Sequence, residues 1–329
     1  MDSLTRHLRN ISLAVTACTV IAHTSAFAQA YPDRPVTLVV PYPPGTLVDI
    51  LARTVSNDLA VILKQPVIVD NRPGAGQVVA ASYVSRAAPN GYTLMITAMP
   101  TITTPSIQKT LPYTGNTDFT AIAHVSHTAP LLVASSQLPV SSLKEFIALL
   151  KANPGKYSFM SAGIGSPIHL YAEMFNKEAG VKAVHIPYKS FQVGLTDIMA
   201  GQVDYGFHTL GSMQHVATGK LKAMGLSSLK RDPGYPNVPT LDEQGLKGFQ
   251  TLVHYFIVGP KGMPPEIVAR LNTAINSVIS SDAYLNKIKP IGGVSPISPP
   301  LTPAQTAALN ASEDDRWLKL VKDQNIALE

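Results

Sequence analysis

Short apolar runs alternate with segments of helical periodicity along this chain, and that alternation limits the possible folds more than any other feature. Residues 35–40, 67–69 and 92–96 are brief apolar runs flanked by turn-forming residues, which is typical of buried strands. Apolar residues recur at helical spacing over 51–62, and a second helix is expected at 78–86. The resulting β-α-β-α-β order predicts a mostly parallel sheet with helices on both faces.

The same alternation continues further along the chain. Ser142 and Glu145 form a capping box that opens a helix. A strand at 157–160 precedes another helix, which has Ser166 as its N-cap and Pro167 in its first turn. Further strands are expected at 184–186, 203–207 and 221–226, and two C-terminal helices begin near 264 and 302.

The order of these elements predicts two α/β blocks, at about 31–130 and 131–250, followed by a tail. A strand near 255–258 in the tail could return to the first block. The chain would then cross between two domains twice, and a cleft would separate the domains.

The N-terminus is typical of a secretory signal peptide. Arg6 and Arg9 precede an apolar run at 11–22, which is too short for a membrane-spanning helix of about 20 residues. The small residues around 26–28 predict cleavage after Ala28. Lipid attachment at Cys18 is a minor alternative. With the signal peptide removed, the chain holds no cysteine, so disulfides, a thiol nucleophile and a thiolate metal site are excluded.

Composition narrows the function classes. Charged residues make up 14% of the chain, the net charge is +5, and Lys and Arg occur singly, which argues against nucleic-acid binding. Hydrophobic residues make up 45%, which is enough for a buried core. We find no second long apolar run and no pattern typical of an oligomer seam. The expected product is therefore an exported, soluble monomer.

Motifs typical of enzymes and cofactor sites are absent from the sequence. It contains neither a G-x-S-x-G elbow nor a P-loop, and Ile168 stands where a dinucleotide fingerprint would place its third glycine. His124 and His127 lie in a strand-like stretch, where a spacing of three predicts opposite faces and disfavours a shared metal. We therefore predict no catalytic residues, no metal and no cofactor.

Two loops of small residues stand out, at 41–49 and 161–166. Each lies between a predicted strand and a predicted helix, where α/β proteins bind ligands. A helix N-terminus offers unpaired N–H groups and a partial positive charge, so one such loop in each block suits a carboxylate held at the domain junction. Ordinary tight turns remain the alternative for either loop.

A series of motifs along the chain resembles the Bug-type periplasmic solute-binding proteins, the receptors of tripartite tricarboxylate transporters. The motifs lie at 31–35, 41–45 with Asp49, 71–76, 88–94, 161–170, 186–189, 201–204, 219–221 and 236–240. The resemblance implies a two-domain periplasmic-binding-protein fold of the "Venus flytrap" type. Its domains would be 29–130 plus 251–329, and 131–250, after a signal peptide at 1–28. It also implies a small carboxylate ligand, permease subunits as partners and a periplasmic location.

The resemblance and the two loops together predict the ligand-binding residues. Tyr42 would lie at the cleft edge, Gly45 and Thr46 would offer backbone N–H groups, and Thr97 and His208 would line the cleft floor. Asp49 would either complement the helix dipole or order its loop by accepting N–H bonds. The full predicted set is Tyr42, Pro43, Pro44, Gly45, Thr46, Val48, Asp49, Thr97, Ser161, Gly163, Gly165, Ser166, His169, Lys189 and His208.

The chain departs from the family pattern near the predicted site. Thr46 replaces a glycine, Val48 stands where a threonine is expected, Ser190 replaces a glycine and Asn90 an aspartate. The added bulk at 46 and the lost hydroxyl at 48 predict a more apolar pocket mouth, suited to an aromatic or longer aliphatic acid.

Two other functions would use the same cleft. An exported enzyme would need His169 or His208 as general base and Ser161 or Ser166 as nucleophile. A sensory receptor would present its loaded form to a signalling partner instead of a permease. The sequence does not distinguish a transport partner from a signalling partner.

Overall fold

The computed structural model describes residues 31–74, 77–98, 112–164, 166–291 and 293–323. From Arg34 onward they belong to one compact unit. The predicted signal peptide, the alternative lipid site at Cys18 and the predicted ligand residue Gly165 lie outside the described residues.

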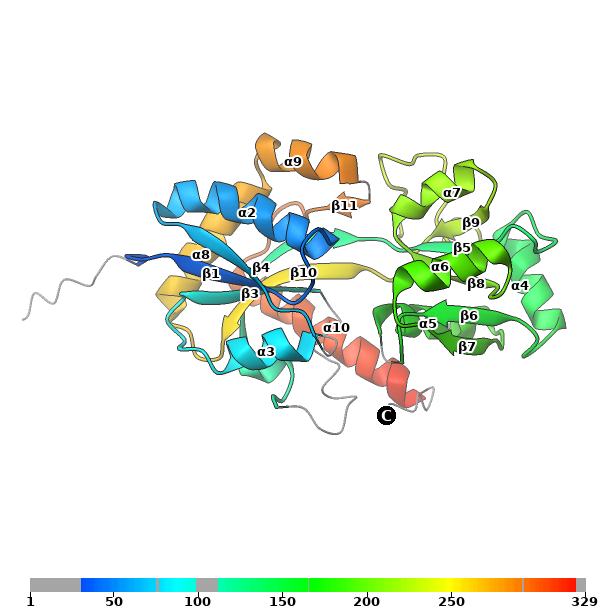
Figure 1. The fold of residues 1–329 in the computed structure, drawn as a ribbon, viewed down its shortest axis with the longest axis horizontal. Helices are drawn as coiled ribbons and strands as arrows, with labels where there is room; N and C mark the ends of the chain where they lie inside the picture. Colours follow the sequence, from blue (N-terminus) through cyan, green and yellow to red (C-terminus); the bar gives the residue numbers. More distant parts are fainter. Residues whose placement is uncertain (1–30, 75–76, 99–111, 165, 292, 324–329) are drawn as a thin grey trace, which may run out of the picture. The chain divides into compact units, whose positions relative to one another are not determined.

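A six-stranded sheet in the order β11-β4-β10-β3-β1-β2 organises what we call lobe 1 (Figure 1). Its strands are β1 (Val36–Val40), β2 (Val67–Asn71), β3 (Thr93–Ala98), β4 (Phe119–Thr128), β10 (Val253–Pro260) and β11 (Val294–Ser295). Its helices are α2 (Leu47–Leu63), α3 (Val78–Ser85), α8 (Pro265–Ile279), α9 (Asp282–Ile288) and α10 (Pro303–Asp323), with short 3-10 turns at η4 (Asn116–Asp118) and η6 (Lys289–Ile291).

Helices cover both faces of this sheet. In Figure 1, α2 and α8 lie on one side of the strands, and α3 and α10 lie on the other. Val39 and Met95 pack with Ala81 of α3. The residues just before them in their strands, Leu38 and Leu94, point to the opposite face and are also buried. Since successive strand residues point to opposite faces, a strand covered on both sides must be apolar throughout, which explains the continuous apolar runs in the sequence.

A five-stranded sheet in the order β7-β6-β8-β5-β9 organises what we call lobe 2. Its strands are β5 (Leu131–Ser135), β6 (Ser158–Ser161), β7 (Val184–Pro187), β8 (Tyr205–His208) and β9 (Leu221–Leu226). Its helices are α4 (Leu143–Ala152), α5 (Pro167–Ala179), α6 (Phe191–Ala200) and α7 (Met213–Ala217), with a 3-10 turn at η5 (Leu210–Ser212).

The core of lobe 2 is aromatic where α4 and α5 cover the sheet. Phe146 of α4 and Phe175 of α5 lie with ring centroids 5.2 and 6.0 Å from that of Tyr205 in β8. Helix α6 packs close against Met160 at Gly194. A Cβ at this position would lie 2.2 Å from the Met160 Cε. Glycine at this position therefore permits the close contact.

Both sheets are mixed, so the prediction of mostly parallel sheets is wrong. Strand β1 pairs in parallel with β2 and β3, and β6 with β7 and β8. However, β10 runs antiparallel to β3 and β4, and β5 runs antiparallel to β8 and β9. Alternation along the sequence predicts parallel pairing only where a helix connects neighbouring strands of one sheet. Strands β5 and β10 instead enter their sheets from the other lobe.

The chain passes between the lobes at two places and contacts both through its last helix. Strand β4 belongs to the first sheet and β5 to the second, and the chain returns between β9 and β10. Leu309 of α10 packs against the lobe 1 core, whereas Trp317 and Leu320 are part of the lobe 2 core. Helix α10 therefore contributes to both lobes.

The prediction that His124 and His127 lie on opposite faces is wrong, because β4 contains an irregularity. Tyr255 pairs with Ser126 and Phe256 with His124, which leaves Val125 as an extra residue. Such a bulge shifts the alternation by one position. The two imidazole centroids are therefore 6.1 Å apart, and His254 of β10 joins them with its Nδ1 atom 3.0 Å from His124 Nε2. Among the described residues, no group of three potential ligands is arranged to hold a metal ion.

Candidate functional site

Strand ends in lobe 1 bring Tyr42 and Thr97 together. Tyr42 follows β1 and Thr97 lies near the end of the parallel neighbour β3, the edge at which α/β sheets bind ligands. Gln77 links the two side chains: its Nε2 donates to the Tyr42 hydroxyl at 2.5 Å, and its Oε1 accepts from Thr97 Oγ1 at 3.0 Å. Thr97 is fully buried, so its hydrogen bond holds the Gln77 amide from inside the protein. Sequence reasoning missed Gln77, because its role depends on Tyr42 and Thr97, which lie far from it in the chain.

Asp49 holds the loop between β1 and α2 in place. Its Oδ2 accepts from the Gly45 N–H at 2.9 Å and from Arg53 Nε at 3.0 Å, and its Oδ1 accepts from Asn71 Nδ2 at 2.8 Å. Burial opposes ionisation, but the hydrogen bonds from Arg53, Gly45 and Asn71 outweigh it and lower the pKa of Asp49. Of the two roles predicted for this carboxylate, the structure displays loop ordering. Sequence reasoning missed Arg53 and Asn71.

The backbone N–H groups of Gly45 and Thr46 already have partners in the loop. Gly45 donates to Asp49, and the Thr46 N–H donates to the Pro43 carbonyl at 3.4 Å. The Thr46 hydroxyl also donates to Pro43, at 2.9 Å, so Thr46 occupies the N-cap of α2 without capping it. The donors that α2 can still offer are the first-turn N–H groups, at Leu47 and Val48, which have no intrahelical partner.

The remaining predicted residues of this loop differ in exposure. Pro43, Pro44 and Gly45 are exposed, whereas Val48 is buried, with 6% of its surface exposed. Val48 therefore offers a ligand its backbone N–H and only a small part of its side chain.

The loop between β6 and α5 is organised by Ser161. The Ser161 Oγ accepts from the Gly163 N–H at 3.1 Å and donates to the Gly163 carbonyl at 3.0 Å. It also lies 2.6 Å from His185 Nε2. The predicted N-cap is confirmed, since Ser166 Oγ accepts from the His169 N–H at 3.5 Å. Ser161 is fully buried, so its hydroxyl shapes the loop from inside.

His169, in the first turn of α5, is a buried residue rather than one that faces solvent. The side chain is buried, and its ring stacks on those of His185 and Phe159 at centroid distances of 4.0 and 6.2 Å. Its Nε2 is 3.7 Å from Glu173 Oε1. Burial, with a smaller contribution from His169, lowers the pKa of His185 to about 4. Sequence reasoning missed His185, which comes from the neighbouring strand β7.

His208 lies at the end of β8, next to the start of α6. Its ring meets that of Phe191 edge-to-face at 5.4 Å, and neither ring nitrogen makes a hydrogen bond of normal geometry to the described residues. Burial lowers the pKa of His208 to about 4, so the imidazole is neutral near pH 7. Ser190 is the N-cap of α6, yet its side chain does not cap the helix. Lys189, just before it, is exposed.

Tyr171 of α5 is fully buried. Burial raises the pKa of Tyr171 in α5, and Tyr255, Glu313 and Tyr42 lie near enough to raise it further. Tyr42 follows β1, and α5 follows the Ser161 loop.

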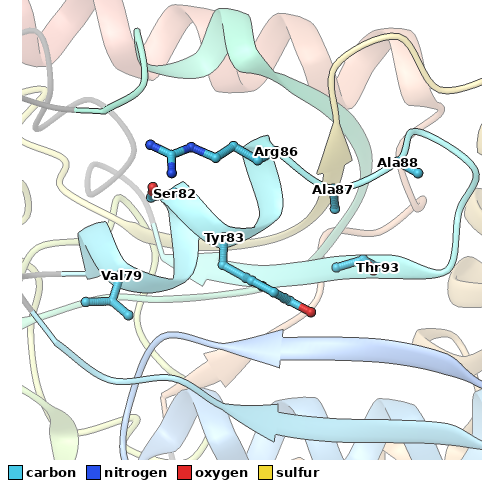
Figure 2. Close-up of a pocket in the computed structure, with 7 residues that line it drawn as sticks. All are labelled: Val79, Ser82, Tyr83, Arg86, Ala87, Ala88 and Thr93. Carbon is cyan, nitrogen blue, oxygen red and sulfur yellow. The ribbon is translucent and has the colours of Figure 1, made fainter.

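A separate depression of about 560 Å³ lies on lobe 1 (Figure 2). Its lining residues are Val79, Ser82, Tyr83, Arg86, Ala87, Ala88 and Thr93. In Figure 2 the Tyr83 ring extends toward Thr93, whereas Arg86 points the other way. Arg72 lies over the Tyr83 ring at 3.7 Å. The depression is at the start of β3, whereas the candidate site is at the ends of β1 and β3.

Comparisons of the sequence and of the structure with known proteins indicate the same family. A family model described as tripartite tricarboxylate transporter family receptor matches residues 51–326. The periplasmic binding protein BugD is similar in structure, with a TM-score of 0.75 and 30% identity over 90% of this chain and 99% of that one. An R. palustris protein solved with adipate has a TM-score of 0.78 and 31% identity, over 90% and 99% of the two chains. MatC from Rhodopseudomonas palustris, with bound malate, has a TM-score of 0.74 and 31% identity, over 88% and 100%.

Proposed function

Because this chain belongs to the tripartite tricarboxylate transporter family of receptors, we propose that it captures a small organic carboxylate and delivers it to a permease of that transporter type. The family consists of solute-binding receptors rather than enzymes. Full burial of Ser161 agrees with this, since a nucleophile must reach its substrate.

The observation that carries the proposal is a pair of helix N-termini without side-chain caps at the strand ends of the two lobes. Helix α2 begins after Thr46 and α6 after Ser190, and neither residue caps its helix through its side chain. The first-turn N–H groups of both helices are therefore available to an anionic group. Two such termini suit a dicarboxylate, with one carboxylate bound at each lobe. The Ser161 carbonyl accepts from the Tyr188 N–H at 2.9 Å, so the Ser161 loop adjoins the segment that leads into α6, and we propose that it belongs to the lobe 2 site.

The side chains near these termini favour a ligand with an apolar middle. Phe191 is partly exposed beside the neutral His208, and Thr46 turns its hydroxyl back to Pro43. A neutral imidazole can donate or accept one hydrogen bond without adding charge. We therefore propose a longer aliphatic or an aromatic acid, in preference to a short hydroxy-acid. The relatives solved with adipate and with malate represent these two classes.

The proposed location is the periplasm, reached through the signal peptide at 1–28. No helix among the described residues has the length and apolarity needed to cross a bilayer. We propose domains at 29–130 plus 251–329 and at 131–250, which close around the ligand. A ligand shifts the equilibrium between the open and closed forms only by binding the closed form more tightly. The permease would then recognise the closed form.

Isothermal titration calorimetry of the protein from residue 29 onward tests the proposal. The panel contains adipate, malate, succinate and benzoate, with 1,6-hexanediol as a neutral analogue of adipate. We expect saturable binding of at least one acid, with adipate or benzoate tighter than malate and no binding of the diol. Equal binding of adipate and the diol, or no binding of any acid by protein purified without ligand, would count against a carboxylate receptor.

A further inference from the structure

His185 contacts both ends of the loop that joins β6 to α5. At the start of the loop its Nε2 lies 2.6 Å from Ser161 Oγ. Beyond the end of the loop its ring stacks on His169 at a centroid distance of 4.0 Å and an interplanar angle of 19°. Its other neighbour is Phe159, whose centroid is 5.0 Å away.

The strand register explains how His185 reaches both ends. Strand β7 pairs in parallel with β6, and His185 is the partner of Phe159, two residues before Ser161. Residues 159 and 161 point to the same face of β6, so the His185 ring stacks on Phe159 and its edge reaches the Ser161 hydroxyl. Helix α5 covers that face and supplies His169.

Proton counting fixes the arrangement at Ser161. A serine hydroxyl has one proton to donate and two lone pairs to accept with. If Ser161 donates to the Gly163 carbonyl and accepts from the Gly163 N–H, its remaining lone pair accepts a proton from His185 Nε2. Only the tautomer with hydrogen on Nε2 satisfies all three contacts.

We propose that His185 is a positioning residue that holds Ser161 and Gly163, at the start of this loop, in their ligand-binding conformation. It donates to Ser161, and Ser161 in turn holds the Gly163 peptide through two hydrogen bonds. The part of this inference that concerns ligand affinity rests on the proposed function. The part that concerns the loop can be tested without ligand.

Two variants separate the hydrogen bond from the stack. His185→Phe keeps an aromatic ring against Phe159 and His169 but removes the donor. His185→Gln keeps an N–H donor at a similar distance from the backbone but removes the ring. Ser161→Ala removes this hydrogen bond together with both Gly163 contacts. His185→Leu, which also lacks the donor, serves as the alternative if His185→Phe does not fold.

Hydrogen exchange at the Gly163 amide of the ligand-free protein is the primary measurement. We expect exchange to be about tenfold faster in His185→Phe, which corresponds to one hydrogen bond, and to return toward the wild-type rate in His185→Gln. Adding Ser161→Ala to His185→Phe should speed the exchange further, because it also removes the acceptor of the Gly163 N–H itself. Exchange at Phe256 in lobe 1 should not change.

Affinity for adipate, measured by calorimetry, is the second readout, and we expect it to fall about tenfold in His185→Phe with partial recovery in His185→Gln. Unchanged Gly163 exchange in a folded His185→Phe protein would overturn the inference, as would equal loss in the Phe and Gln variants. If the wild type binds no acid of the panel, the proposed function fails, whereas faster Gly163 exchange in His185→Phe would still support the positioning role.

Discussion

Arg316 of α10 donates a hydrogen bond to the backbone carbonyl of Gln250, in the segment that leads from lobe 2 into β10. The same guanidinium lies 3.7 Å from Glu313, and Trp317 Nε1 donates to Glu313 at 3.0 Å. Burial raises the pKa of Glu313, whereas Arg316 and Trp317 oppose that rise. Helix α10 therefore anchors one of the two segments that connect the lobes and compensates a buried carboxylate at the same place.

Replacing Arg316 should destabilise the protein. Arg316→Met keeps the apolar stem but leaves the Gln250 carbonyl and Glu313 without their partner, so we expect a loss of about 1–3 kcal/mol in the free energy of unfolding. Urea denaturation followed by tryptophan fluorescence suits this measurement, because Trp317 is adjacent. Arg270→Met, at an exposed position on α8, is the matched control and should change stability little. Equal stability of both variants would show that the Gln250 contact is energetically unimportant.

Asp49→Asn should loosen the loop between β1 and α2. The variant loses the charge that Gly45 N–H and Arg53 bind, so we expect about 1–3 kcal/mol of lost stability and weaker binding of adipate. The folded-state pKa of Asp49 lies below its ordinary value of 3.8, so its contribution is present above about pH 4 and declines below it. Urea denaturation at pH 7 and at pH 3.5 should therefore show a smaller difference between wild type and variant at the lower pH. The exposed Asp282→Asn provides the comparison.

Local signals in the sequence predicted local structure well. The Glu145 N–H donates to Ser142 at 3.2 Å, as the capping box predicts, and Ser166 with Pro167 opens α5. Each signal lies within four residues, so no distant partner is needed to specify it. The shared family motifs likewise predicted the fold class correctly.

Features that depend on distant partners were not predictable in this way. The bulge at Val125 arises from pairing with β10, about 130 residues later, and it reverses the predicted facing of His124 and His127. The roles of Gln77 and His185 depend on neighbours from other strands. The sequence predicted Asp49 and Ser161, which order their own loops, but not their distant partners Asn71 and His185.

Buried histidines should make the protein sensitive to acid. Burial lowers the pKa of His254 to about 3, and it also lowers the pKa of His124 and His127. Because the unfolded chain binds protons near pH 6.5, stability is fully present above that pH and falls below it. For one such imidazole the loss at pH 5 is about 2 kcal/mol.

His254→Gln should reduce this acid sensitivity. The wild type should lose more stability between pH 7.5 and pH 5 than the variant, as measured by urea midpoints at both values. His215→Gln, at a partly exposed position on α7, is the control and should behave like the wild type. Identical pH profiles for His254→Gln and the wild type would contradict the expected linkage.

Val48→Thr tests whether the departure at this position sets ligand preference. The two side chains have similar volume, and Val48 is only 6% exposed, so the added hydroxyl would be close to the first-turn N–H groups of α2 rather than in open solvent. We expect a severalfold increase in the ratio of malate to adipate affinity, because a hydroxyl there adds a polar partner for a short hydroxy-acid. Val61→Thr, on the same helix at 78% exposure, should leave the ratio unchanged. If titration calorimetry gives the same ratio for both variants, specificity is set by other residues, of which Phe191 and His208 are the next to replace.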